Sequence, residues 1–135
     1  MLFLVEYQSQ RLWVVLASMV FVASSGAFAH HSTAPYDLIH GTIIEGSVTR
    51  FDLVNPHGNI ALDVRGEDGA VEHWTVAIEG AVLLRRLGWS RDTLKPGDKI
   101  TVTGNRAKNG SFHLRGVYVQ LRDGRKLMAL PGPEQ

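Results

Sequence analysis

The residues in this chain whose types and spacing could do chemistry are histidines. His30 and His31 stand side by side, directly after the run of small residues ASSGAFA. If the chain is cut after Ala29, the α-amine and ring of His30 can hold one metal ion together, and imidazole is a favoured ligand for Cu(II). The amine, the intervening amide and the ring of His31 offer a second copper-binding mode. The alternative is that both side chains are solvated and bind nothing specifically.

A second candidate site combines a turn with a hairpin loop. His57 lies in NPHG, residues 55–58, while Lys108 and Asn109 lie in NRAKNGS, residues 105–111. If the chain forms a small β-barrel, loops at these places border one ligand face. We expect Asn55, His57, Lys108 and Asn109 to line that face, with His57 as a third metal ligand. The alternative is structural: Asn55 shapes the turn, which His57 caps.

The other polar residues give no catalytic signature. The carboxylates Asp63, Glu72 and Glu79 are too scattered for a paired acid/base site. The chain has no cysteine, which excludes disulfides, thiolate metal sites and Cys nucleophiles. No phosphate loop, nucleophile elbow or zincin motif occurs. His73 and His113 are expected on outward strand positions, solvated or packed, and we predict that the protein is not an enzyme.

The N-terminal segment has the features of a secretory signal peptide. An uncharged apolar run, residues 12–24, leads into Ala27-Phe28-Ala29, an A-x-A cleavage site. The run is shorter than the roughly 20 residues of a membrane-spanning helix, so we expect no stable membrane insertion. Cleavage after Ala29 leaves 106 of the 135 residues, enough for one periplasmic domain. The net charge of +1 gives no electrostatic reason to expect a nucleic acid partner.

The rest of the chain alternates short strand patterns with turns. We expect a signal peptide at 1–29, an extended arm at 30–40, a barrel domain at 41–130 and a tail at 131–135. Ile60, Leu62 and Val64 alternate with polar or small residues, and the alternation in VEHWTVAI turns the Trp74 ring into the core. Gly46 and Gly116 interrupt their strand patterns, which indicates bulges or bends in the first and fifth strands.

One segment has a helical pattern. In GAVLLRRLGW, residues 80–89, Val82, Leu83 and Leu87 recur at helical spacing, and Gly88 can end the helix. Trp89 follows and is placed to seal one end of a barrel. Five to six short strands with one short helix between the third and the fourth predict an all-β, OB-fold-like Greek-key barrel. The runner-up is an open β-sandwich or another small barrel.

Several short motifs occur together along residues 30–128: HHS, NPH, a Trp in the third strand, RRLGWSRDTLKPGD and ITVTG with the AKNGS loop. In this combination the chain resembles an uncharacterised family of short exported bacterial proteins. The resemblance implies a periplasmic location and a small β-barrel, and carries no activity. The Leu94–Gly104 stretch is also similar to strand four of periplasmic OB-fold proteins that include haem chaperones, but no histidine follows His113 to tether a haem.

These observations leave two functions open. The first is an exported binding module that holds copper or another small ligand through His30, His31 and the His57 loop. The second is a non-catalytic accessory protein that docks on a periplasmic partner through the face of its second and third strands and uses no metal. Convergence of the histidines on one point would favour the first function, and scattered histidines would favour the second.

Overall fold

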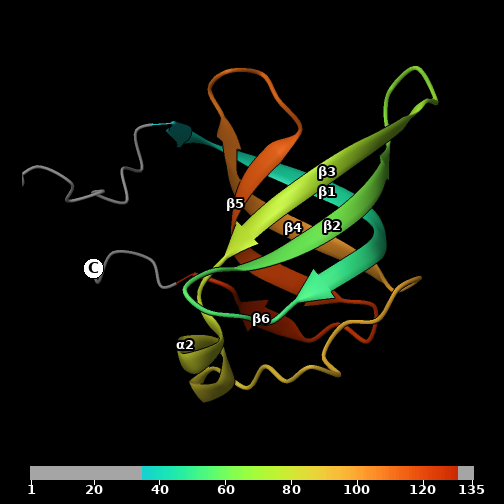
Figure 1. Ribbon diagram of the computed structural model, residues 1–135. Coiled ribbons are helices and arrows are strands. Elements are labelled where there is room, and N and C mark those ends of the chain that lie inside the picture. The colour runs from blue at the N-terminus through green and yellow to red at the C-terminus, as the bar shows by residue number, and fades with distance from the viewer. Residues whose placement is uncertain (1–34, 131–135) are drawn as a thin grey trace, which may run out of the picture. The chain divides into compact units, whose positions relative to one another are not determined.

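The computed structural model describes residues 35–130, and Figure 1 shows their arrangement. They form six strands and one short helix. The elements are β1 (Tyr36–Asp52), β2 (Gly58–Arg65), β3 (Val71–Ile78), α2 (Ala81–Arg86), β4 (Lys99–Ala107), β5 (His113–Leu121) and β6 (Lys126–Met128). No helix among the described residues is long and apolar enough to cross a bilayer.

The strands close into the expected barrel. Neighbours follow the order β3-β2-β1-β4-β5-β6, and β3 also pairs with β5. That pairing is parallel, with Thr75 opposite His113, whereas the other pairs are antiparallel. The helix lies between β3 and β4. The protein is therefore an OB-fold-like Greek-key barrel with β6 as an added strand.

The long strand β1 serves two neighbours. Its first part pairs with β4 as far as Ser47, and its pairing with β2 starts at Gly46. A Cβ at Gly46 would lie 2.7 Å from the carbonyl oxygen of Asp63, so a side chain does not fit where the strand changes partners. Irregularities in register fall beyond this point, between Val48 and Arg50, and before it, between residues 36 and 41.

The expected irregularity in β5 lies beside Gly116. Thr103 and Gly104 are consecutive in β4, but their partners Tyr118 and Gly116 are two residues apart, so Val117 is an extra residue. The carbonyl of Val117 accepts hydrogen bonds from the two residues that follow β6, 129 and 130. The bulge therefore attaches the C-terminal segment to the barrel.

The barrel interior confirms the strand alternation. Trp74 is 4 % exposed, and its inward neighbours in β2 and β3 are buried with it. Burying one such apolar side chain contributes about 1.5–3 kcal/mol relative to leaving it in water. The barrel strands supply these core residues: Ile44, Val48, Ile60, Leu62, Val64, Trp74, Val76, Ile78, Ile100, Val102, Leu114 and Val119.

The helix is where expected but buries a different face. Ala81 and Leu84 are buried, whereas Val82 is 56 % exposed and Leu87 is only half-buried. A helix of six residues makes fewer than two turns, so the neighbouring chain sets its orientation more than its own apolar pattern does. Gly88 follows the helix with a positive φ of 91°, as a helix-ending glycine does.

The boundary of the barrel also differs from the expectation. Residues 36–40 of the expected arm already belong to β1, and Tyr36 pairs with Ala107. The barrel thus begins at Tyr36 and not at residue 41, because strand pairing with β4 extends beyond the glycine that starts the apolar pattern. The expected signal peptide, 1–29, and tail, 131–135, lie outside the described residues.

Candidate functional site

The loop between β1 and β2 carries Asn55 and His57 and is attached to the start of α2. The Asn55–Pro56 peptide bond is cis. The Asn55 side-chain oxygen accepts a hydrogen bond from the Val82 N–H at 3.2 Å. A Cβ at Gly80 would lie 2.9 Å from that same oxygen. Asn55 therefore has a structural contact that joins the loop to the helix, and His57 is exposed on the same loop.

The loop between β4 and β5 carries Lys108 and Asn109 and is attached to the start of β1. The backbone N–H of Lys108 donates to the Pro35 carbonyl at 2.8 Å. The Asn109 side-chain oxygen accepts from the N–H and the hydroxyl of Ser111, at 3.0 and 2.7 Å. Asn109 thus stabilises the bend of its own loop, as Asx turns do.

The structure does not bring these two loops together. Gly58, which follows the first loop, pairs with Ile78 at the end of β3, whereas His113, which follows the second, pairs with Thr75. In Figure 1 the β1–β2 loop lies beside α2, and the β4–β5 loop lies at the opposite end of the barrel. Asn55 and His57 therefore lie at one end, and Lys108 and Asn109 at the other.

The histidines are also distributed. His30 and His31 lie outside the described residues, so copper binding there stays a prediction. Within residues 35–130, no group of three His, Asp or Glu side chains is placed to hold a metal ion. The Nδ1 of His73 lies 2.7 Å from Asp63 Oδ1, and the ring of His113 lies 6.0 Å from that of Tyr36. The described histidines thus have local partners.

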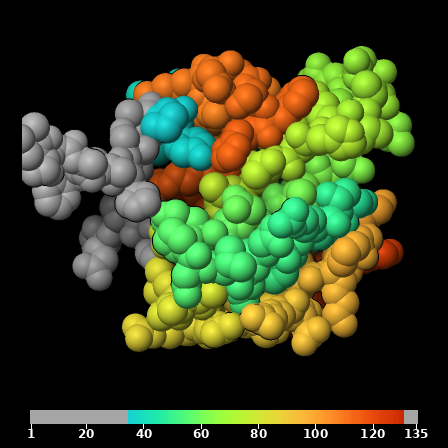
Figure 2. Space-filling model, in the orientation of Figure 1, coloured from blue at the N-terminus to red at the C-terminus, as the bar shows by residue number. Residues whose placement is uncertain are grey.

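Strand register builds a different candidate site on the outside of β2, β3 and β5. Ile60, Val76 and Leu114 are fully buried, so the residues on either side of them in sequence face outward. In Figure 2, β2 and β3 lie at the surface facing the viewer, and no other described segment covers them. Two outward rows cross the three strands, Ala61, Thr75, His113 and Asn59, Ala77, Arg115.

We call five of these residues, Ala61, Thr75, Ala77, His113 and Arg115, the outer shelf. Its floor consists of the small side chains of Ala61, Thr75 and Ala77, and its β5 side carries a ring and a guanidinium. His113 and Arg115 are half-buried, and the Arg115 side chain makes no hydrogen bond or ion pair with the described part of the chain. The outer shelf therefore offers donors beside a surface where a ligand can lie close to the backbone.

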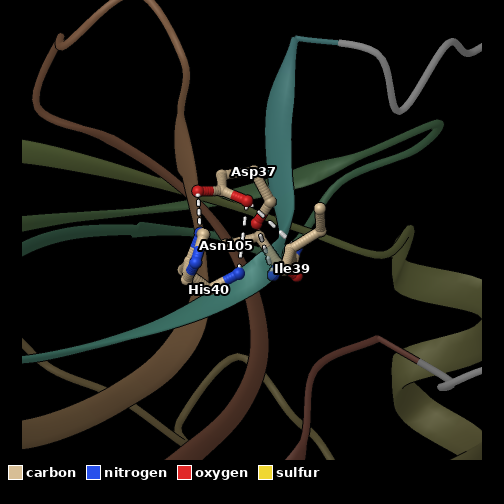
Figure 3. Close-up of polar contacts among 4 residues, drawn as sticks. All are labelled: Asp37, Ile39, His40 and Asn105. Atoms are coloured by element: carbon tan, nitrogen blue, oxygen red, sulfur yellow. Dashed lines mark hydrogen bonds and ion pairs between the residues drawn. The ribbon is translucent and has the colours of Figure 1, made fainter.

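A carboxylate–histidine pair lies at the start of β1, as Figure 3 shows. The His40 Nδ1 lies 2.8 Å from Asp37 Oδ2, and the N–H groups of Ile39 and His40 donate to Oδ1. The hydrogen bond from the His40 ring, followed by those from the two N–H groups, holds the pKa of Asp37 below its ordinary value. The Asn105 side chain donates to the Asp37 carbonyl at 2.8 Å, which attaches this bend to β4.

An open groove of about 460 Å³ lies where β1 changes partners. Its walls carry both signs of charge, so it does not select one sign of ligand. Its lining residues are Glu45, Gly46, Ser47, Asp63, Val64, Arg65, Val71 and Lys99. Within residues 35–130 no polar or charged residue is buried. Hydrogen bonds from the N–H and the side chain of Arg125 lower the pKa of Asp123.

The fold and the outer shelf define a small OB-fold-like barrel whose β2 and β3 are not covered by another described segment. The chain belongs to a family of unknown function (DUF6152), whose model matches residues 17–116. Comparison with curated proteins and with solved structures gave no significant match. The family assigns no activity, so the function has to be argued from the residues of this chain.

Proposed function

We propose that this protein is an exported, non-catalytic binding module that takes its ligand on the outer shelf. The observation that carries the proposal is the arrangement of Arg115 and His113 beside the small floor residues Thr75 and Ala77. The Tyr36 ring at the start of β1 borders this face, 6.0 Å from the ring of His113. OB-fold barrels commonly bind their ligands on the face of strands two and three. Export is supported by the A-x-A sequence at residues 27–29.

This proposal differs from the histidine-loop hypothesis in where the ligand lies. Asn55 is engaged with α2, and Asn109 stabilises its own loop, so these two side chains are already used within the chain. The outer shelf instead has the half-buried residue Arg115, whose guanidinium no described residue engages. A small ligand suits this arrangement, because the two donor side chains lie on one side of small side chains.

A matched pair of variants tests the proposal. Thr75→Tyr fills the outer shelf, whereas Thr103→Tyr places the same side chain on β4, where Thr103 pairs with Tyr118 away from the shelf. Both residues are half-buried in strands that tolerate aromatic side chains, and thermal unfolding checks that both variants fold. The binding assay records amide NMR shifts of the isotope-labelled protein on titration with the low-mass fraction of a periplasmic extract, and separately with its protein fraction.

We expect the low-mass fraction to shift the amides of β3 and β5 in the wild type and in Thr103→Tyr, and not in Thr75→Tyr. Shifts confined to the β1–β2 loop, or shifts that persist in Thr75→Tyr, would contradict the proposal. A response on these strands to the protein fraction alone would replace the small ligand with a docked partner protein, which is the second function left open by the sequence.

A further inference from the structure

We infer that the outer shelf is an oxyanion site, where Arg115 and His113 bind a phosphate or carboxylate group with the Thr75 hydroxyl as a third donor. The inference rests on the proposed function, because it names the ligand class of the same face. Phosphate and carboxylate share the chemistry that counts here: a negative charge spread over oxygens that accept hydrogen bonds.

The first support is that Arg115 differs from three other arginines of the barrel. Arg50 is 2.8 Å from Asp52, Arg125 is 2.7 Å from Asp123, and the Arg106 guanidinium lies 5.0 Å from the centre of the Trp74 ring. Arg115 is half-buried and has no comparable contact with the described residues. A guanidinium has five N–H donors in a planar fork and no acceptor, so one without a partner among the described residues is suited to a bidentate anion.

The second support is the spacing of the donors. Arg115 and His113 are two residues apart on one strand and face outward, which separates them by about 6.5–7 Å. Thr75 is the register partner of His113 on the adjacent strand, about 4.8 Å away. These are backbone separations, and they place the three side chains close enough together for their donors to converge on one group at the roughly 2.7–2.9 Å of charge-assisted hydrogen bonds.

The third support concerns the nearby carboxylates. Asp63 is paired with His73, and Asp52 with Arg50, so neither is available to neutralise the β5 side of the shelf. Glu79 follows the end of β3 and forms no ion pair with Arg115 in the described part of the chain. The local charge at Arg115 is therefore positive although the whole chain carries only +1.

The test is a titration of the purified, exported protein with sodium phosphate and, in a separate arm, with sodium acetate. Sodium chloride keeps the ionic strength constant, and amide NMR shifts of β3 and β5 report binding. Arg115→Gln removes the proposed anchor, Arg115→Lys keeps the charge without the planar fork, and Arg50→Gln is the matched control. Thermal unfolding verifies that each variant is folded.

We expect saturable shifts with at least one anion, weakened at least tenfold in Arg115→Gln, partly in Arg115→Lys and less than twofold in Arg50→Gln. Saturation by phosphate alone or by acetate alone supports the site and identifies the source of the oxyanion. Equal losses in Arg115→Gln and Arg50→Gln, or no saturation with either anion, would overturn the inference. If neither anion saturates but the low-mass extract still shifts the amide signals of β3 and β5, the proposed function stands and only the ligand class is wrong.

Discussion

At the α2 end of the barrel, Trp89 is 2 % exposed, its ring lies 5.8 Å from that of Phe51, and its Nε1 donates to the Met128 carbonyl at 2.8 Å. At the β4–β5 loop end, Trp74 is 4 % exposed, but it packs against the Arg106 guanidinium and against Phe112, which is 43 % exposed. Both rings are buried at a barrel end, and both indole N–H groups donate a hydrogen bond, that of Trp74 to Glu72 Oε2 at 2.8 Å. The groups that cover the two rings differ.

The difference shows which end of the molecule can open without unfolding. At the α2 end the cover includes a helix and a backbone carbonyl, so exposing Trp89 requires main-chain movement. At the other end Arg106 lies over Trp74 and donates to the carbonyls of Gly110 and Ser111 at 3.0 and 3.4 Å. There the cover consists of the Arg106 and Phe112 side chains, so we expect this end to open at lower free energy than the α2 end, as regions with few buried contacts do.

The largest expected effect comes from the tryptophans themselves. Trp89→Ala should lower the free energy of unfolding by about 4–5 kcal/mol and Trp74→Ala by about 3–4 kcal/mol, because each leaves a cavity in a small core without disulfides. Urea unfolding followed by circular dichroism measures both. A loss under about 1 kcal/mol for Trp74→Ala would mean that its ring is not part of the core. The reverse order of the two losses would break the comparison between the ends.

The next prediction tests how much the Arg106 side chain, which lies over Trp74, contributes to stability. Arg106→Ala should cost about 1–2 kcal/mol, since it removes a cation–π contact and hydrogen bonds to the loop. Arg106→Met keeps the apolar stem over the ring and should recover part of that loss. Hydrogen exchange at the Gly110 and Ser111 amides should accelerate in both variants, while exchange in α2 stays unchanged. Equal acceleration at both ends would show that the barrel opens only as a whole.

A third prediction asks whether copper binds at the processed terminus or at the α2 end. One residue added before His30 displaces the α-amine from both chelates, so affinity for Cu(II) should fall at least about tenfold, or roughly 1.4 kcal/mol. Copper titration of the native and extended proteins at equal pH measures this, after intact mass has established that the native chain begins at His30. Equal affinities would exclude the terminal site, and loss of binding in His57→Ala would then place copper beside α2.

The smallest expected effect is a pH dependence at the start of β1. The pKa of Asp37 is lowered in the folded protein, chiefly by the hydrogen bond from the His40 ring. The stabilisation that ionised Asp37 gives to the start of β1 is therefore fully present above the ordinary carboxyl pKa. It is lost as the pH falls through the lowered value. The protection of the Ile39 and His40 amides against hydrogen exchange, measured relative to the intrinsic rate at each pH, should therefore fall in acid, and Asp37→Asn should remove that dependence. Asp123→Asn removes the other carboxyl with a lowered pKa and should leave the pH dependence at Ile39 and His40 unchanged.

Much of the fold could be predicted from patterns of neighbouring residues in the sequence. Alternation in β2 and β3, the place of α2 between β3 and β4, and the bulge beside Gly116 all agree with the structure. The buried face of α2 did not follow, because a helix with fewer than two turns has too few apolar positions to fix its own rotation. Leu84 is buried there, and Val82, which the spacing favoured, is exposed.

The candidate site was harder to predict, because it depends on partners distant in sequence. The parallel pairing of Thr75 with His113 and of Ala77 with Arg115 builds the outer shelf, and no local motif marks it. Sequence reasoning placed His113 outward but missed Arg115. The signal that could have found Arg115 is an arginine between the apolar Leu114 and the bulge at Gly116. Asn55 was found as a loop residue, but its contact with α2 depends on the folded chain.

The irregular start of β1 also affects how the protein behaves at high concentration. Tyr36 and residues 41–45 pair with β4, and no other described strand pairs with their second edge. Ile39 and Ile43 are 87 % and 70 % exposed in this part of β1. An open edge with apolar side chains invites pairing with another chain. Here the change in register between residues 36 and 41 and the Asp37–His40 pair interrupt the flat ladder that a second molecule would need. The same bend that attaches the first strand to Asn105 thus protects the barrel against edge-to-edge aggregation.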